Sequence, residues 1–572
     1  MTAEPVQTSA TASQEIPVGG NGHRGGDGAG DPDNGGAANG AANPGVGDGT
    51  TRLDTIHSRL PGDLVERLVQ QVAAVRPAPV TAASHSPLTG ELIAEYPDCT
   101  PDDVYAAFGK ARAAQAAWGQ LPVQHRTKIF RRFHDLVLER EAQLLDLVQI
   151  ETGKSRKHAF EEVLVAAGVT RHYAHAARGY VKTRRRRGVL PVLTKTLEVR
   201  VPKGVVGVIT PWNYPLALTV SDVIPALIAG NAVVHKPDTQ TALTGLRLRE
   251  LAVQAGLPAD LWQVVVGEGG VVGPAVVENA DYVAFTGSTA TGRRVAQQAA
   301  GRLVGCSLEL GGKNAMLVLD DADLDKAVAG AVRGCFSSAG QLCISIERLY
   351  VHYTKYDDFL QRFLTEVRAL RLGSGLDYTA DMGSLTSTKQ LETVTLHVED
   401  AKAKGAKVLA GGRRRPEIGP LFYEPTVLGD VRDLMTVFAE ETFGPVVSVY
   451  KFSNEAEVIA EANGTAYGLN ASLWTRDHKR ARDIARQLHV GTVNVNEAYA
   501  AAFGSVAAPM GGMGDSGVGR RHGSEGILRF TEAQTVARQR LLPIAPWFGM
   551  SEQRWGRMMA RSLRLFKALR LK

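Results

Sequence analysis

A lone cysteine, Cys343, lies in the stretch GQLCIS, residues 340–345. It follows a flexible glycine and belongs to none of the spaced pairs of residues that bind metals, so we assign no metal ligand. A thiolate at this position could act as a nucleophile and form a covalent intermediate with a substrate. The alternative is a small buried hydrophobic residue, the ordinary role of an isolated cysteine.

Two other polar residues lie in stretches that could support such a nucleophile. Glu309 precedes a glycine pair in LELGGKN, residues 308–314, and a carboxylate whose pKa is raised by burial can act as a general base. Asn213 lies between aromatic residues and prolines in TPWNYP, where its amide could stabilise an oxyanion. Each also has a structural explanation, because Glu309 could be a surface residue at a strand end and Asn213 could pin the loop.

A glycine-rich turn follows a predicted strand in DYVAFTGSTATGRR. The strand ends at Thr286, and Gly287 to Gly292 lead into a helix, an arrangement that presents backbone N–H groups to phosphate. The stretch lacks the Lys-Ser/Thr pair of a P-loop, so nucleotide hydrolysis is disfavoured. A thiol, a carboxylate, an amide donor and a phosphate-binding turn together fit oxidation of an aldehyde through a thioester, with a nicotinamide cofactor that accepts hydride.

The elements that must position these residues alternate in type. After about residue 200, β-branched runs such as GVVGVIT and NAVVHKP are each followed by a helical stretch. This alternation is typical of βαβ units and a parallel, doubly wound sheet. A second α/β run begins near residue 310 with AMLVLDD. Two such lobes predict a cleft in which cofactor and substrate meet.

The two ends of the chain differ from its middle. Residues 1–52 are rich in Gly, Ala, Asn and Asp and are predicted to be disordered, because they have little to bury. Residues 551–572 carry seven basic residues and one acidic residue, a net charge of +6 that equals the formal charge of the whole chain. On a helix, one side would carry Arg554, Arg557, Arg561 and Arg564. The other side would carry the apolar residues Trp555, Met558, Met559, Leu563 and Phe566. Such a basic amphipathic helix suits an anionic membrane surface, and the alternative is a helix docked on this protein or on a neighbouring subunit.

The charge distribution and the cysteines indicate which binding partners and which cellular location to expect. Outside the tail the chain is neutral, so we expect no nucleic-acid binding, and we interpret KTRRRRG, residues 182–188, as a solvated basic turn. The four cysteines are widely scattered, as suits a reducing compartment. Without an early signal sequence or a long apolar run, the expected location is the cytoplasm.

Six motifs occur in the order TPWNYP, KPD, FTGST, LELGGKN, GQLC and EETFGPVV. In that order they resemble the NAD(P)-dependent aldehyde dehydrogenase superfamily, over about residues 75 to 540. Three longer stretches, PKGVVGVITPWNYPLALTVSDVIPAL, GQLCISIERLYV and APMGGMGDSGVGRRHG, are similar to bacterial NADP-linked members that oxidise succinate semialdehyde. The resemblance implies an α/β fold with two Rossmann-like lobes and a small β oligomerisation arm. It also implies a homodimer or homotetramer that converts succinate semialdehyde to succinate. The implied cofactor is NADP, with NAD as the alternative.

The same resemblance implies domain limits and residue roles. The expected domains are a cofactor-binding domain over 57–182 and 203–307, an oligomerisation arm over 183–202 and 528–540, a catalytic domain over 308–527 and a tail over 541–572. Cys343 would be the nucleophile and Glu309 the general base, while Asn213 and the Cys343 backbone N–H would form the oxyanion hole. The cofactor-binding residues that it implies are Trp212, Asn213, Lys236, Pro237, Asp238, Thr239, Gly287, Ser288, Leu310, Glu441 and Phe443.

Two departures from the family pattern bear on specificity. Thr239 stands where many NAD-preferring members have a glutamate, and loss of that carboxylate removes repulsion against a 2′-phosphate, although Asp238 lies next to it. Ser221 and Ser337 stand where several succinate-semialdehyde enzymes have arginines. A hydrophobic, aromatic or long-chain aldehyde, oxidised at a membrane surface, is therefore the alternative. A non-enzymatic binding role is disfavoured by the intact set of residues, and a CoA-acylating reaction is disfavoured because Glu309 can activate water.

Overall fold

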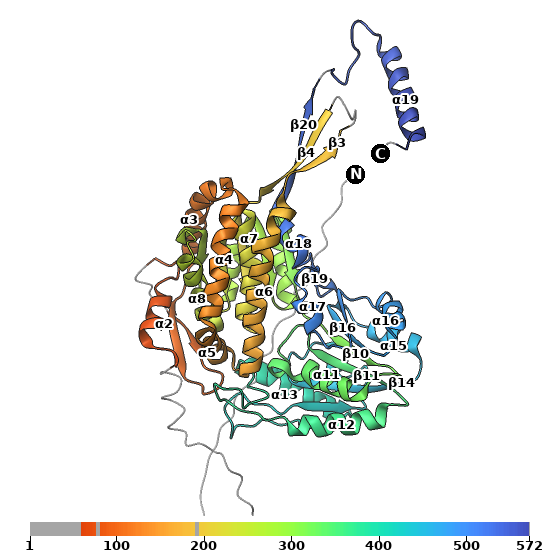
Figure 1. Cartoon of the computed structure of the whole chain (residues 1–572). Coiled ribbons are helices and arrows are strands. Elements are labelled where there is room, and N and C mark those ends of the chain that lie inside the picture. Colours follow the sequence, from red (N-terminus) through yellow and green to blue (C-terminus); the bar gives the residue numbers. More distant parts are fainter. Residues whose placement is uncertain (1–58, 76–80, 189–193, 541, 571–572) are drawn as a thin grey trace, which may run out of the picture. The chain divides into compact units, whose positions relative to one another are not determined.

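The computed structural model of the chain describes residues 59–75, 81–188, 194–540 and 542–570 (Figure 1). Residues 1–52, which are predicted to be disordered, lie outside the described residues. Two largely parallel sheets with flanking helices make up most of the described chain. The predicted α/β fold with two Rossmann-like lobes is confirmed.

A helix begins at Pro101, and a capping box closes its first turn. The Thr100 side chain accepts a hydrogen bond from Asp103 N at 3.2 Å, and the Asp103 carboxylate accepts one from Thr100 N at 2.8 Å. This helix belongs to the run that precedes the first large sheet: α2 (Gly62–Val69), β1 (Thr81–His85), β2 (Leu92–Pro97), α3 (Pro101–Gln120), α4 (Val123–Glu139), α5 (Glu141–Thr152) and α6 (Arg156–Val181).

The first large sheet has the order β19-β9-β8-β5-β6-β7. Its strands are β5 (Val205–Thr210), β6 (Ala232–Pro237), β7 (Trp262–Val264), β8 (Tyr282–Thr286), β9 (Gly305–Glu309) and β19 (Gly517–Val518). All pairs are parallel except β19 with β9. The connecting helices are α7 (Pro215–Ala229), α8 (Ala242–Gln254), α9 (Gly269–Asn279) and α10 (Thr289–Gly301). The order of strands reverses between β5 and β8, which makes the carboxyl ends of these two strands the expected binding crevice.

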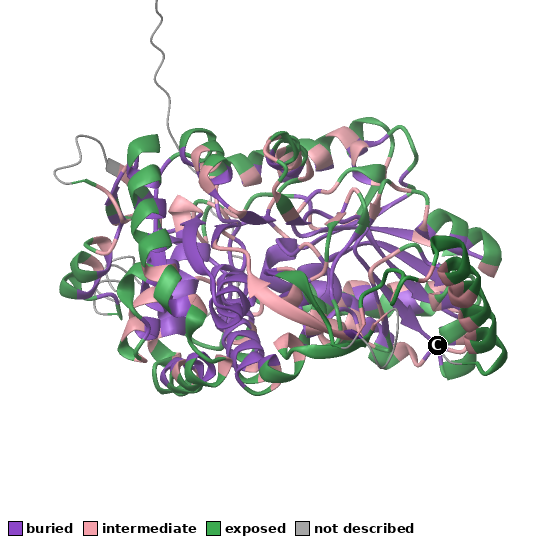
Figure 2. Cartoon of the chain, turned by 90° about the horizontal axis from the view of Figure 1, so that it is seen from above, coloured by how far each residue is buried: buried purple, intermediate pink, exposed green. Residues whose placement is uncertain are grey.

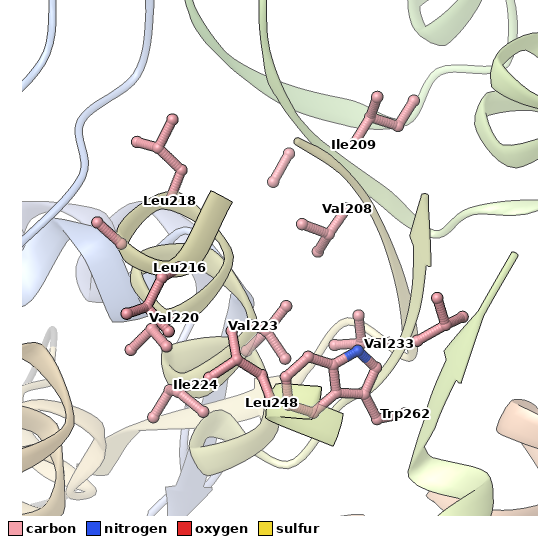
Figure 3. Packing of buried hydrophobic residues seen from close by; sticks show 14 of the residues in the cluster. Val208, Ile209, Leu216, Leu218, Val220, Val223, Ile224, Val233, Leu248 and Trp262 are labelled. Atoms are coloured by element: carbon pink, nitrogen blue, oxygen red, sulfur yellow. The ribbon is translucent and has the colours of Figure 1, made fainter. Parts of the chain in front are cut away.

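Helix α7 is buried along its whole length, because it is apolar on every side rather than on one stripe. Figure 3 shows Val220, Val223 and Ile224 of this helix near Leu248 of α8 and Trp262 of β7. In Figure 1, α4, α6 and α7 lie side by side, and all three pairs of helices are in contact.

The second large sheet has the order β12-β13-β14-β11-β10-β16-β17 and is parallel except for the β12–β13 pair. Its strands are β10 (Asn314–Val318), β11 (Ile346–His352), β12 (Lys407–Ala410), β13 (Thr426–Gly429), β14 (Val446–Phe452), β16 (Asn470–Trp474) and β17 (Thr492–Val495). The helices around it are α11 (Leu324–Phe336), α12 (Tyr356–Ala369), α13 (Thr388–Ala403), α14 (Thr436–Ala439), α15 (Glu455–Ala462), α16 (His478–Ala485) and α17 (Ala500–Gly504). Three short elements follow the pattern less closely: β15 (Tyr467–Gly468), β18 (Met513–Gly514) and α18 (Gly523–Leu528).

The expected limit between the two lobes needs adjustment. Strand β9 crosses the limit set between residues 307 and 308, yet the whole strand pairs with β8 in the first sheet. Strand β19, expected in the catalytic domain, also pairs with β9. The chain therefore returns to the first lobe near its end, which a linear sequence pattern does not reveal.

A third sheet, with the order β20-β4-β3, is antiparallel. It consists of β3 (Arg184–Arg187), β4 (Thr194–Pro202) and β20 (Thr531–Gln539). The interpretation of the arginine run as a turn is wrong, because all four arginines pair with β4 as an edge strand. Their side chains are exposed, and charged side chains on an edge strand limit pairing with further strands.

The predicted tail helix is present as α19 (Glu552–Ala568) and begins at Ser551, whose hydroxyl accepts a hydrogen bond from Arg554 N. None of its residues is buried, in contrast to the strands of the large sheets (Figure 2). Leu563, Leu565 and Leu569 are more than half exposed, at 59%, 55% and 59%. Within the described residues, none of the helices combines the length and apolar character needed to cross a membrane.

Candidate active site

The residues singled out in the sequence follow the carboxyl ends of four neighbouring strands. Trp212 and Asn213 follow β5, and Lys236 is the second-last residue of β6. Gly287 follows β8, and Glu309 is the last residue of β9. These strands are parallel neighbours, so their carboxyl ends meet at one edge of the sheet. The fold thus brings together stretches that are about a hundred residues apart in the chain.

Cys343 lies in a tight turn immediately before β11 of the second sheet. Ser345 N donates to Leu342 O at 2.7 Å, and the Asn314 side chain donates to the Cys343 carbonyl at 2.8 Å. Burial raises the pKa of the Cys343 thiol to about 12, and the negative charges of Glu441 and Glu309 act in the same direction. The thiol is therefore a nucleophile only after a base has removed its proton.

The backbone before Cys343 is strained. Ser338, Ala339 and Gly340 have φ angles of 50°, 54° and 69°, in the left-handed region that non-glycine residues rarely adopt. Two contacts hold this turn: Ser338 N donates to His158 Nδ1 at 3.2 Å, and the Ser338 and Tyr214 hydroxyls are 3.0 Å apart. The packing around the loop fixes its conformation.

Glu309 is buried, and its Oε1 has no hydrogen-bond partner among the described residues. Burial raises the pKa of this carboxyl to about 7, while the guanidinium groups of Arg521 and Arg529 oppose the rise. A buried acceptor without a partner is uncommon and costly. The carboxylate is thus poised to take a proton near neutral pH from a group that enters the site.

Asn213 joins the two lobes. Its side-chain N–H donates to Gln341 O at 3.0 Å, so the loop after β5 is tied to the cysteine loop. Its own carbonyl accepts from Lys154 Nζ at 2.6 Å, and Lys154 forms a buried ion pair with Glu162 at 2.5 Å. Because an amide has two N–H donors, one remains for a substrate oxygen.

The residues predicted for the phosphate end of a dinucleotide fit that role. Ser288 caps α10, where its hydroxyl accepts from Thr291 N, and the helix begins with its free N–H groups. A Cβ at Gly287 would lie 2.7 Å from the Phe285 ring, so only glycine fits beside that ring. Lys236 is buried, and its Nζ donates to Pro237 O at 3.1 Å. Among the described residues it forms no ion pair, although the charges of Asp238 and Asp98 act on it. A buried ammonium that lacks a direct counter-charge suits a hydroxyl or phosphate oxygen.

An adenine ribose bound at Lys236 would lie near both positive and negative side chains. Burial lowers the pKa of Lys236, and the carboxylates of Asp238 and Asp98 oppose that change. Asp238 is already engaged as a cap that accepts from Gln240 N at 3.0 Å. The Thr239 hydroxyl donates to Gly267 O at 3.2 Å, and it places no negative charge at this point.

The residues predicted for the nicotinamide end come from both lobes: Trp212 and Leu310 follow strands of the first sheet, and Glu441 and Phe443 precede β14 of the second. The Trp212 and Phe443 rings meet edge to face with centroids 5.6 Å apart. Glu441 Oε1 accepts from Gly312 N at 2.9 Å, and burial raises the pKa of Glu441 to about 8. Leu310 packs against Gly292, where a Cβ would come within 2.5 Å of the leucine side chain.

A buried ion pair holds the backbone of the loop that carries Glu441 and Phe443. Glu347 accepts hydrogen bonds from Thr442 N at 2.9 Å and from Phe443 N at 2.9 Å, and it pairs with Lys313 at 2.5 Å. Phe443 has a φ of 52°, so its loop is strained as well. The residues present therefore fit a nicotinamide dinucleotide at the carboxyl edge of the first sheet.

Sequence reasoning missed a buried charge network beneath Glu309. Arg521 donates to both oxygens of Asp222, at 3.0 and 2.8 Å, and to the Thr286 hydroxyl at 2.8 Å. Arg529 reaches Asp222 at 2.5 Å. The sequence did contain one sign of this network, since Asp222 is the only charged residue of α7.

The two serines that stand in place of the expected arginines are also buried. Ser221 Oγ has no partner among the described residues, and Ser337 Oγ donates to Arg333 O at 2.8 Å.

Comparison with known proteins agrees with this geometry. The model of the aldehyde dehydrogenase family matches residues 75–536. A Mycolicibacterium smegmatis protein provisionally named succinate-semialdehyde dehydrogenase (NADP+) is 54% identical over 84% of this chain and 93% of its own length. A Mycobacterium ulcerans protein with the same provisional activity in its name is 50% identical over 87% of this chain and 96% of its own length.

Solved structures show the same fold. A crystal structure of an E. coli NADP-dependent enzyme has a TM-score of 0.79 and 35% identity, and the match covers 83% of this chain and 99% of that one. The structure of betaine aldehyde dehydrogenase from Staphylococcus aureus in complex with NAD+ has a TM-score of 0.79 and 32% identity over 85% of this chain and 99% of that one.

Proposed function

Because this chain belongs to the aldehyde dehydrogenase family, we propose that it oxidises succinate semialdehyde to succinate, with NADP preferred and NAD as an alternative cofactor. The observation that carries the chemistry is the buried carboxyl of Glu309, whose Oε1 has no partner among the described residues and whose charge acts on the pKa of the partly buried Cys343. The named activity of the relatives at 50% and 54% identity supports the substrate and the cofactor. The hydrophobic or aromatic aldehyde remains the competing substrate class.

Cys343 and Asn213 carry the first half of the proposed reaction. Cys343 Sγ loses its proton to water, attacks the aldehyde carbon and forms a C–S bond, while the carbonyl electron pair moves to oxygen. The remaining Asn213 N–H and the Cys343 backbone N–H donate to that oxyanion. A nicotinamide cofactor, when bound, supplies an acceptor for the hydride that leaves this carbon.

Glu309 carries the second half. Its carboxylate takes a proton from water, the water oxygen attacks the thioester carbon, and the C–S bond breaks. The electron pair of that bond returns to Cys343 as thiolate, and the carboxylic acid product loses its remaining proton to solvent and leaves as a carboxylate. With a pKa of about 7, Glu309 is a strong enough base to activate water and is still deprotonated in a large share of molecules at neutral pH.

Separate groups of this chain would hold the cofactor. Gly287 and Ser288 would bind the pyrophosphate at the start of α10, and Lys236 the adenine ribose or its phosphate. Trp212, Leu310, Glu441 and Phe443 would enclose the nicotinamide end. Thr239 supports NADP, because it presents a hydroxyl where a carboxylate would repel a 2′-phosphate.

One set of rates tests the substrate and the cofactor together. Initial rates with succinate semialdehyde, benzaldehyde and a long-chain aldehyde, each with NAD and NADP, should give the highest kcat/KM for succinate semialdehyde with NADP. A higher value for benzaldehyde or the long-chain aldehyde would contradict the proposed substrate. A higher value with NAD would contradict the proposed cofactor alone.

The three-stranded arm and the free cysteines support an oligomeric state and a cellular location for the enzyme. A three-stranded arm exposes the edges of β3 and β20, and we assign to it the contact that builds a homodimer or homotetramer. Cys306, Cys335 and Cys343 carry free thiols, as is usual in a reducing compartment, which supports a cytoplasmic location.

The tail helix α19 supports a contact with an anionic membrane surface. Its polar side carries Arg554, Arg557, Arg561 and Arg564, and its other side carries the exposed Leu563, with Trp555 and Phe566. An exposed apolar stripe beside a basic one suits a lipid interface, where the apolar side chains enter the boundary between headgroups and acyl chains. The tail lies beyond residue 536, where the match to the family ends, so this contact would be an addition to the family activity.

A further inference from the structure

A cavity of about 230 Å³ lies beside the start of the cysteine loop. Residues from the end of α11 and from the first turns of α6 line it, among them Arg333, Ser337, Lys157, His158 and Glu161. Ser337 is only six residues before Cys343. The next residue, Ser338, contacts Tyr214, which adjoins Asn213. The cavity therefore borders the loop that leads to Cys343, and that loop contacts the residue after Asn213.

Arg333 is the side chain that can bring a positive charge to this place. It lies one helical turn before Ser337, so the two residues share a face of α11. Its guanidinium is 5.1 Å from the centre of the Tyr499 ring, and the Tyr499 hydroxyl donates to Ser337 Oγ at 2.8 Å. Its side chain is 41% exposed, which leaves it open to a ligand from solvent.

Donors of Arg333 remain for a ligand. Arg333 Nη1 donates to Glu497 at 3.2 Å, whereas Glu161 Oε1 is 3.8 Å from Arg333 Nε. Glu161 Oε2 also lies 3.1 Å from the Tyr499 hydroxyl oxygen. A guanidinium has five N–H donors in a planar fork, so most of them are not used by Glu497. The fork geometry matches a carboxylate with two parallel hydrogen bonds.

The balance of charge in the cavity favours an anion when Glu161 is protonated. Burial raises the pKa of Glu161, and a carboxylate ligand nearby would raise it further. On the other side of the cavity, Asp381 is paired with both Lys157, at 3.1 Å, and Arg371, at 3.0 Å. With Glu161 neutral, the cations around the cavity outnumber the carboxylates.

We propose that Arg333 binds the carboxylate at the far end of the substrate and so selects aldehydes that carry a terminal carboxylate. This inference rests on the proposed function and deepens it. It supplies the cation that neither Ser221 nor Ser337 can provide, from one helical turn earlier on α11. Arg333 is thus assigned to specificity, while Cys343, Glu309 and Asn213 carry the chemistry.

The test compares an anionic and a neutral aldehyde of the same length, succinate semialdehyde and butanal. Arg333→Met should raise KM for succinate semialdehyde by about 10- to 100-fold, since a hydrogen bond to a charged group contributes about 1.5–3 kcal/mol. KM for butanal should stay the same or fall, and Arg333→Lys should give an intermediate value. Lys326→Met on the same helix is the matched control, because Lys326 is 75% exposed and pairs only with Asp323 among the described residues; it should leave both substrates unchanged.

Two further measurements keep the outcome clear. Because Arg333→Met leaves Glu161 and Glu497 without their cation, the double variant Arg333→Met/Glu161→Gln should show the same selective loss with restored thermal stability. Inhibition of butanal oxidation by succinate should weaken by about the same 10- to 100-fold in Arg333→Met, whether or not succinate semialdehyde is a substrate.

The outcomes separate the two proposals. Wild-type enzyme that oxidises butanal but not succinate semialdehyde would contradict the proposed function. Unchanged KM and unchanged succinate inhibition in Arg333→Met would overturn the role of Arg333 alone. An equal loss for both aldehydes would also overturn it, because it would assign Arg333 a structural role.

Discussion

Two ionisable side chains, the buried Glu309 and the partly buried Cys343, set the chemistry of the site at the level of single residues. The same burial that raises the pKa of Cys343 to about 12 raises that of Glu309 to about 7. The thiol is therefore protonated at neutral pH, whereas the carboxyl is divided between its two forms. Cys343 therefore acts as a nucleophile only after its proton has passed to water, and the oxyanion donors then stabilise the product of its attack.

Cys343→Ala should abolish turnover and leave dinucleotide binding nearly unchanged. The thiol forms the covalent intermediate, whereas other side chains hold the cofactor. Loss of a nucleophile costs far more than about 100-fold in kcat. Steady-state rates and cofactor titration by fluorescence would measure the two effects, and residual turnover above about 1% of wild type would remove Cys343 from this role.

Glu309→Gln should permit one round of oxidation per site and slow the release of product. An amide of similar shape allows attack and oxidation, but it cannot take a proton from water. Rapid-mixing absorbance of the reduced cofactor should therefore show a burst followed by a slow steady state. A steady-state rate equal to that of wild type would make Glu309 a bystander.

Arg521 should set the pH at which Glu309 works. In the wild type, hydrolysis of the thioester should rise with pH as Glu309 loses its proton and level off above its pKa of about 7. The Arg521 charge lowers that pKa, so Arg521→Gln should move the rising limb to higher pH. Arg521→Lys retains the charge and is the control; a profile of Arg521→Gln that overlies the wild type would reject the electrostatic role.

At the level of elements, the sequence indicated which strands carry the site but not how their ends are fixed. The alternation of apolar runs predicted β5, β6, β8 and the parallel sheet, because period and length are local properties. The left-handed turn at Ser338 and Ala339 was not predictable, since it depends on His158 and Tyr214, more than a hundred residues away in the chain. The Asp222–Arg521 pair escaped notice for the same reason, as 299 residues separate its members.

Gly340→Ala should disable the cysteine loop. Gly340 has a φ of 69°, and a Cβ there would overlap the carbonyl oxygen of Gly444, so both strain and a backbone clash oppose the change. We expect a loss of kcat of more than about 10-fold, since a misplaced nucleophile is costly, together with a lower melting temperature. Gly109→Ala in α3, where a Cβ would meet nothing within 4 Å, is the control and should keep wild-type activity; equal behaviour of the two variants would contradict the argument.

At the level of the whole molecule, the tail is the part that the family activity does not explain. Full-length enzyme should sediment with anionic vesicles at low salt and be released as salt rises, because each basic residue near the surface adds about 1 kcal/mol of attraction that is screened within a Debye length. A truncation that ends at Pro546 should remain in the supernatant with the same kcat. Vesicles of neutral lipid serve as the control.

The same two proteins distinguish a lipid contact from a docked helix. If the truncated form changes its oligomeric state in size-exclusion chromatography and the full-length form ignores vesicles, the apolar side of α19 belongs to a subunit contact. The membrane proposal would then be withdrawn.

The division of labour between the two sheets has a further consequence. Glu309 ends a strand of the first sheet, whereas Cys343 precedes a strand of the second, and Asn213 bridges them through a single hydrogen bond to Gln341. Neither lobe alone holds a complete catalytic set. A small shift of one lobe relative to the other would separate Glu309 from Cys343 without unfolding either sheet. A protein that is fully folded could therefore be inactive.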